Sequence, residues 1–214
     1  IESMKITAEG GFASTLQILK TLVDNSQYVK LLNTEDKPYK SLVEWIVKRS
    51  SISYNVRYPS LKTIGASIGI NGQMVTKHIK TIYDDIIELN NSNIDLFIKP
   101  GDIVCCFSFK AYRRSGSFYI GLKTIPRIGE KFEFDFMLPM VGADMFYIRD
   151  INHTIIKGVH EIDVTATGHE QFLYLKLLRE KAYLTKYISW DEFYGFQEDE
   201  EKVNQKVLKM NTRL

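Results

Sequence analysis

The sequence predicts an α+β fold with a helical N-terminal region, a β-rich module and C-terminal helices. Two changes of pattern indicate this order: aromatic and β-branched residues dominate from residue 93 to residue 167, whereas helical spacing of apolar residues precedes and follows them. The 214 residues are 44% hydrophobic and 25% charged, which is typical of a globular protein and excludes a mainly disordered one. The expected segments are residues 1–37, 38–99, 100–167 and 168–214.

The N-terminal region is predicted to form helices over residues 12–32 and from Pro38 to an end between Arg49 and Ser53. In both stretches the apolar residues return at helical intervals, namely Phe12, Leu16, Leu19 and Val23 in the first and Leu42, Val43, Ile46 and Val47 in the second. Thr34 is a candidate cap, and Pro38 suits a first helical turn.

Two further helices are predicted between Tyr58 and Leu89. Ser60 follows Pro59 and can cap a helix from Leu61 to Ile68, which Gly69 would end. Asn71 can cap the next helix, whose apolar residues fall at intervals of four, three, four and three: Val75, Ile79, Ile82, Ile86 and Leu89.

The β-rich module is predicted to be small and antiparallel, either a barrel or a curled sheet. Strands are expected over residues 94–98, 103–112, 117–123, 132–138, 145–151 and 159–166. Arg113, Arg114, Ser115 and Gly116 separate two of these runs and are expected to form a hairpin tip.

Helices are expected again after Gly168. Ser189 and Glu192 have the spacing of a capping box, and the acidic run from Glu198 to Glu201 is interpreted as the solvated start of a last helix.

Residues 64–79 resemble a helix-turn-helix. Gly65 is small where the two helices would cross, Gly69 and Ile70 would form the turn, and Val75 and Ile79 would anchor the second helix. With Pro59 and Ser60 in front, the stretch resembles the winged-helix DNA-binding domains of bacterial GntR-type regulators and of phage or plasmid replication proteins, over residues 38–123 at most. The resemblance implies a winged helix that binds DNA. Gly72 and His78 depart from the usual pattern.

The local charge favours the same function independently. Residues 45–82 contain Lys48, Arg49, Arg57, Lys62, Lys77 and Lys80 and no acidic residue, so 6 minus 0 gives +6 in a chain whose net charge is +2. The rest of the chain then carries −4. A cluster of cations on the predicted helices suits phosphate neutralisation, whereas the alternative is an ordinary solvated basic face.

If the helix after Asn71 enters a major groove, the residues opposite its apolar stripe face the bases: Asn71, Gly72, Gln73, Thr76, Lys77 and Lys80. Gln73 could then pair with adenine, Lys77 with guanine, and Thr76 with a thymine methyl group. Phosphates would be held by Lys62, Lys80 and the Ser60 end of the preceding helix, with Arg57 adding charge. An exposed helix position without a ligand is the alternative for each polar residue.

Two hairpins are candidates for the wing. One has Arg113 and Arg114 at its tip, where they could reach a minor groove or the backbone of DNA. The other would pair residues 94–99 with residues 103–109 and turn at Pro100, Gly101 and Asp102.

The sequence gives no support for catalysis, a cofactor or a metal site. It lacks a nucleophile elbow, a P-loop and a zinc-protease motif, and Cys105 and Cys106 lie together in an apolar stretch. His153, His160 and His169 match no zinc spacing, and His160 is interpreted as a core residue because it alternates with Ile162, Val164 and Ala166. An enzyme built on the β module is the weakest hypothesis.

No apolar run is long enough for a membrane span, so a soluble protein is expected, and the reduced cysteines favour the cytoplasm. The chain begins at Ile1 and not at a methionine, so the sequence does not decide whether further residues precede it.

The sequence therefore predicts a DNA-binding protein, with a transcriptional regulator as the leading interpretation. A replication or mobile-element accessory protein is one alternative. The other is a winged helix that binds proteins instead of DNA, with Tyr112, Phe118 and Tyr119 on a partner surface. The β module and the last helices could serve homodimer formation, partner contact or effector sensing, and the sequence does not choose among these roles.

Overall fold

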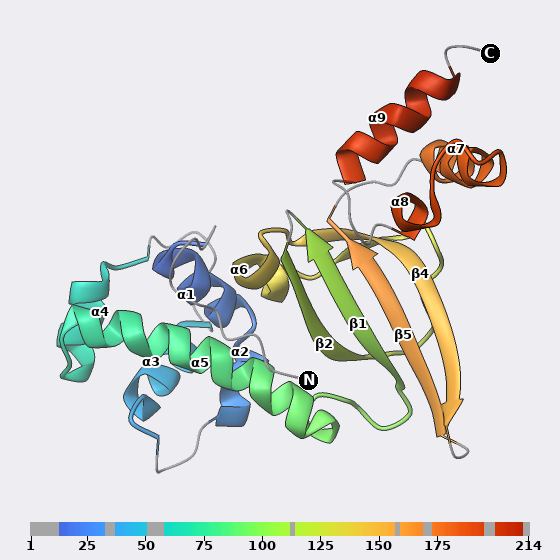
Figure 1. Cartoon of the computed structure of the whole chain (residues 1–214). Coiled ribbons are helices and arrows are strands. Elements are labelled where there is room, and N and C mark those ends of the chain that lie inside the picture. The colour runs from blue at the N-terminus through green and yellow to red at the C-terminus, as the bar shows by residue number, and fades with distance from the viewer. Residues whose placement is uncertain are drawn as a thin grey trace. The chain divides into compact units, whose positions relative to one another are not determined.

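A computed structural model describes residues 13–32, 37–50, 58–111, 114–156, 159–168, 173–194 and 200–211. The chain divides into two compact units, residues 1–168 and residues 169–214. The fold is a mixture of helices and one curled sheet, which confirms the predicted α+β class (Figure 1).

Most helices of the first unit precede its sheet in the chain. They are α1 (Thr15–Asp24), α2 (Ser26–Val29), the 3₁₀ turn η1 (Lys30–Leu32), α3 (Lys40–Ser50), α4 (Leu61–Ile68) and α5 (Gly72–Ser92). The predicted helix over residues 61–68 has the same bounds as α4. The expected cap Thr34 lies outside the described residues.

Five strands of the described residues form one sheet: β1 (Ile103–Ala111), β2 (Arg114–Leu122), β3 (Lys131–Glu133), β4 (Met145–Ile156) and β5 (Val159–Thr167). Their order is β2-β1-β5-β4-β3. The β1–β2, β3–β4 and β4–β5 pairs are antiparallel, but β5 runs parallel to β1. The prediction of an antiparallel module is therefore wrong at the β1–β5 pair. In the chain, β3 and β4 come between β1 and β5. Strand β5 then lies between β4 and β1 and runs in the same direction as β1.

Two predicted strands are also wrong. Residues 94–98 contain the 3₁₀ turn η2 (Ile94–Leu96) instead. Of residues 132–138, only the first two belong to a strand, and η3 (Asp135–Met137) and α6 (Leu138–Val141) follow. Pro139 at the start of α6 has no N–H for a β ladder, and Gly142 ends the helix in the left-handed region with φ 81°.

One hydrophobic core joins the helices of the first unit to its sheet, and the C-terminal half of α5 is one of the elements that connect them. Tyr83 stacks on Phe136 with 5.0 Å between ring centroids and donates its hydroxyl to the Phe136 carbonyl at 2.7 Å. The fully buried Asn90 accepts a hydrogen bond from the Tyr119 N–H at 2.7 Å and donates one to the Tyr119 carbonyl at 3.0 Å. The Asn90 side chain thus pairs both backbone groups of Tyr119 on the edge strand β2, as a neighbouring strand would.

The second unit contains α7 (Leu173–Leu184), α8 (Trp190–Tyr194) and α9 (Glu200–Asn211) among its described residues. Its small core consists of Leu178, Ala182, Ile188, Val203 and Val207. The predicted capping box is confirmed, because the Ser189 N–H donates to Glu192 at 2.6 Å and the Glu192 N–H donates to the Ser189 hydroxyl at 3.2 Å.

Within the described parts of both units, no helix has the length and apolar character that a membrane crossing requires.

Candidate nucleic-acid interface

Helices α4 and α5 pack closely because residue 65 is a glycine. A Cβ atom at Gly65 would lie 2.5 Å from the Ile70 carbonyl oxygen and 3.2 Å from a methyl group of Val75. Gly69 adopts φ 77°, and the N–H of Ile70 donates to the Gly65 carbonyl at 2.9 Å. These contacts fix the turn between the two helices in the way the sequence predicts.

Both helices begin at the predicted caps. The Ser60 hydroxyl accepts the Thr63 N–H at 3.1 Å, and the Asn71 side-chain oxygen accepts the Met74 N–H at 2.8 Å. Each cap satisfies a backbone donor that its own helix cannot pair. Because Asn71 uses its oxygen as the cap, its amide NH₂ is the group that it can offer to a ligand.

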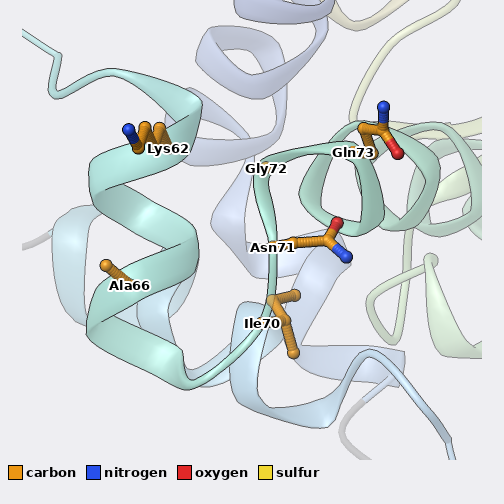
Figure 2. Close-up of a pocket in the computed structure, with 6 residues that line it drawn as sticks. All are labelled: Lys62, Ala66, Ile70, Asn71, Gly72 and Gln73. Carbon is orange, nitrogen blue, oxygen red and sulfur yellow. The ribbon is translucent and has the colours of Figure 1, made fainter.

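An open hollow of about 660 Å³ lies between α4 and the start of α5. Figure 2 shows Lys62 and Ala66 on α4, across from the backbone that leads from Ile70 through Asn71 and Gly72 to Gln73. Ala66, Ile70 and Gly72 give the hollow apolar or side-chain-free surface, whereas Asn71, Gln73 and Lys62 give it polar groups and one cation. A hollow of this character can accept a flat group that presents both carbon and hydrogen-bonding atoms.

The predicted site residues fall into two groups. Ser60, Lys62, Asn71, Gln73 and Lys77 are exposed, whereas Gly72, Thr76, Lys80 and Arg114 are half-buried. Arg57 and Arg113 lie outside the described residues.

Two of the half-buried residues already make contacts within the protein. Gly72 faces α4, since a Cβ atom at this residue would lie 3.5 Å from the Lys62 backbone. Thr76 donates its hydroxyl to the Gly72 carbonyl at 3.2 Å. Sequence analysis missed Met74, whose side chain is 38% exposed on α5 between Gln73 and Lys77. Its place between two polar positions of the exposed face is the signal that could have found it.

The cations of this surface differ in the partners that the described residues give them. Among the described residues, Lys62, Lys77 and Lys80 form no ion pair with a carboxylate. Arg49, by contrast, lies over the Tyr58 ring, 5.4 Å from its centroid. The lysines of α4 and α5 therefore keep their charge available for an external anion.

The charge of α5 reverses along its length. Lys77, Asp84 and Glu88 lie seven and four residues apart and share one face of the helix. Asp85 accepts hydrogen bonds from Lys37 at 3.0 Å and from the Tyr39 hydroxyl. Burial is the main cause that raises the pKa of Tyr39, and the hydrogen bond to Asp85 raises it further. Asp85 thus ties α5 to the chain segment in front of α3.

His78 lies beneath the exposed face of α5 and is 5% exposed. Its ring contacts Tyr39 edge-on, with 6.3 Å between centroids. Burial lowers the pKa of His78, and the neighbouring Lys77 lowers it further. A neutral imidazole therefore fills this position of the helix interface at neutral pH.

One of the two candidate wings is wrong. Residues 94–96 form η2, so no hairpin pairs residues 94–99 with β1. The β1–β2 hairpin is present and ends at the Ala111–Arg114 pair. β1 also pairs with β5, so this hairpin belongs to the five-stranded sheet.

The predicted positions of Phe118 on a partner surface and of His160 in the core are both wrong. Phe118 is 1% exposed and packs in the core, so it presents nothing to a partner, while Tyr112 lies outside the described residues. His160 is exposed instead of buried, because the apolar face of β5 ends at Ile162 before it reaches His160.

No protein-family model, no curated protein and no solved structure matches the chain. The case for a function therefore rests on the geometry and charge of the α4–α5 face.

Proposed function

We propose that this protein binds double-stranded DNA through α4, the Gly69–Asn71 turn and the N-terminal half of α5, and that it regulates transcription. The observation that carries the proposal is the coincidence of a close-packed pair of capped helices with three exposed or half-exposed lysines that have no carboxylate partner among the described residues. A helix pair of this kind can place its second helix in a major groove while the first crosses the backbone.

In this arrangement Lys62, Lys80 and the capped start of α4 hold phosphates. Gln73 and Lys77 lie one turn apart on the exposed face of α5 and reach base edges, and Asn71 offers its amide NH₂ beside them. Met74 provides an apolar contact for a thymine methyl group. Thr76, whose hydroxyl bonds within α5, and Gly72, which packs against α4, contribute through the shape of the surface.

The charge reversal limits how α5 can lie against DNA. Glu88 stands about 16 Å further along the helix than Lys77 and on the same face. A helix lying flat along the groove would bring Asp84 and Glu88 against phosphates, which repel carboxylates. Helix α5 therefore enters the groove by its N-terminal end, with the second half directed away from the duplex.

A protein partner is the second candidate, and the apolar character of Ala66 and Ile70 at the hollow and of the exposed Met74 on α5 favours it. The two candidates differ in their dependence on salt, because binding that neutralises phosphates weakens steeply as salt rises.

The test is binding to random-sequence duplex DNA over a salt series, with a variant carrying Lys62→Ala, Lys77→Ala and Lys80→Ala. The matched control replaces three exposed lysines elsewhere, Lys30, Lys99 and Lys131, and so removes the same charge. We expect the first variant to make the log–log slope shallower by about 2 to 3, because each phosphate contact contributes about 0.9 to it. The control variant should keep the wild-type slope.

Equal losses in both variants would show that only net charge matters and would contradict the proposed face. If neither variant nor the wild type binds at low salt, the protein-interaction candidate takes its place. Selection of binding sites from the random pool would then separate a promoter-type target from the repeated sites of a replication origin or an element end.

A further inference from the structure

Two histidines face one another on the β4–β5 hairpin, away from the α4–α5 face. Nδ1 of His153 lies 2.9 Å from Nε2 of His160, and both residues are exposed. They share the face of the sheet that carries the buried Ile162, which is the cross-strand partner of His153.

The two rings meet head-on. Their centroids are 5.2 Å apart, which equals the separation of the two nitrogens plus the two ring radii, and the planes differ by 24°. One nitrogen must donate and the other accept, so one lone pair and one proton now point into the gap. A tautomer shift moves that proton to the far nitrogen of the same neutral ring and turns both lone pairs toward the gap.

The spacing of the two nitrogens is that of adjacent ligands around a metal ion. A metal–nitrogen bond of about 2.0–2.1 Å places two ligand nitrogens at right angles about 2.9 Å apart, and a tetrahedral angle separates them by about 3.3 Å. The separation of 2.9 Å already matches two ligands at right angles, but each ring must turn by about 45° so that its lone pair leaves the line between the nitrogens and points at a common ion. Exposed side chains rotate easily enough to make this turn.

The backbone beneath the pair is held in register. Antiparallel pairing of β4 with β5 is continuous from the Asp150–Thr165 pair to the Ile156–Val159 pair, so the positions of the two histidines are fixed by several neighbouring pairs. His153 lies opposite Ile162, which is only 3% exposed and anchors that part of the hairpin in the core. Both ligands therefore project from a preorganised support.

We propose that His153 and His160 form a binding site for a divalent late transition metal ion, of the class Ni²⁺, Cu²⁺ or Zn²⁺, with water in its remaining positions. Neutral imidazole is a preferred ligand of these ions, and late transition metals bind nitrogen donors far more tightly than Mg²⁺ or Ca²⁺. Among the described residues no third histidine, cysteine or carboxylate completes the set, which gives an open site with exchangeable positions. This site does not depend on DNA binding.

The experiment is titration of the untagged full chain with Ni²⁺ by calorimetry, alongside His153→Gln and His160→Gln. The control is His169→Gln, which removes an imidazole from a position outside the described residues. We expect one ion per chain, a dissociation constant raised about tenfold or more by either of the first two variants, and no change in the control. Electron paramagnetic resonance of the Cu²⁺ complex should show two coupled nitrogens in the wild type and one in either variant.

Both histidines are exposed, so circular dichroism should show that the variants keep the wild-type fold. The proposal is overturned if the wild type binds no Ni²⁺ at about 1 mM, or if His169→Gln alone removes the binding. It is overturned equally if the two hairpin variants bind as tightly as the wild type.

Discussion

The two halves of α5 have opposite surroundings. The N-terminal half contacts α4 through the glycine of residue 65 and exposes Gln73 and Lys77. The C-terminal half is bound to the sheet through Tyr83 and Asn90, and its exposed charges are acidic. Under the proposed function, the N-terminal half meets DNA while the C-terminal half fixes the helix to the sheet, so that the binding surface lies on a rigid element.

Substitution Gly65→Val should have the largest effect on this arrangement. The added Cβ atom would lie 2.5 Å from a backbone oxygen, and a backbone atom cannot rotate away as a side chain can. We expect a loss of about 3 kcal/mol in the free energy of unfolding, measured by urea denaturation. A wild-type midpoint would show that α4 and α5 do not pack through residue 65.

Substitution Asn90→Ala tests the other half of the helix. It removes both hydrogen bonds to the Tyr119 backbone and leaves those two groups without their partner. We expect a loss of about 2 kcal/mol in stability, seen as a lower urea midpoint. DNA affinity of the folded variant should stay within about twofold of the wild type, since the change lies far from the exposed face. A larger loss of affinity would mean that the halves are not separate.

The pH dependence of stability should reveal the protonation of His78. The pKa of His78 is lowered in the folded state, so the unfolded chain binds the proton more readily, and stability falls as the pH drops below about 6.5. His78→Leu should remove that part of the acid destabilisation in thermal unfolding between pH 8 and pH 5. The same slope in wild type and variant would assign the effect to other groups.

Substitution Gly72→Ala should have the smallest effect. Its Cβ atom would meet the Lys62 backbone at 3.5 Å, which is an ordinary contact, and alanine favours the helical conformation. We expect a gain of up to about 1 kcal/mol in the free energy of unfolding. A loss as large as that of the Gly65 variant would show that the start of α5 is packed as tightly as its crossing with α4.

Local signals explain why the α4–α5 pair could be predicted from the sequence. Ser60, Gly69 and Asn71 each satisfy backbone groups within a few residues of themselves, so their roles can be recognised without knowledge of the rest of the fold. The apolar stripe of α5 is equally local, and Val75, Ile79, Ile82 and Ile86 are all buried.

The sheet could not be predicted to the same extent, because its pairing depends on residues far apart in the chain. The parallel pairing of β1 with β5 joins residues more than fifty positions apart, and nothing near either strand announces it. The aromatic run around Phe134 alternates as a strand would, yet Pro139 and Gly142 turn its end into a helix. The exposure of His160 depends on where the core ends, which the alternation of residues does not reveal.

Because the two halves of α5 differ, charge changes in each half can separate the effect of a charge's position on DNA binding from the effect of net charge. Lys77→Glu and Glu88→Lys exchange charges of equal size on the same exposed face, one in each half of the helix. If DNA binding depended on net charge alone, the two variants would shift the affinity by similar amounts in opposite directions.

The most direct measurement is the affinity of these two variants for the same duplex at one fixed salt concentration, by fluorescence anisotropy. The first change should weaken binding about 100-fold, because it places a carboxylate at the phosphates and base edges. The second should alter affinity less than about threefold, because residue 88 lies more than a Debye length from the bound duplex. Equal and opposite shifts would contradict binding through the N-terminal half of α5.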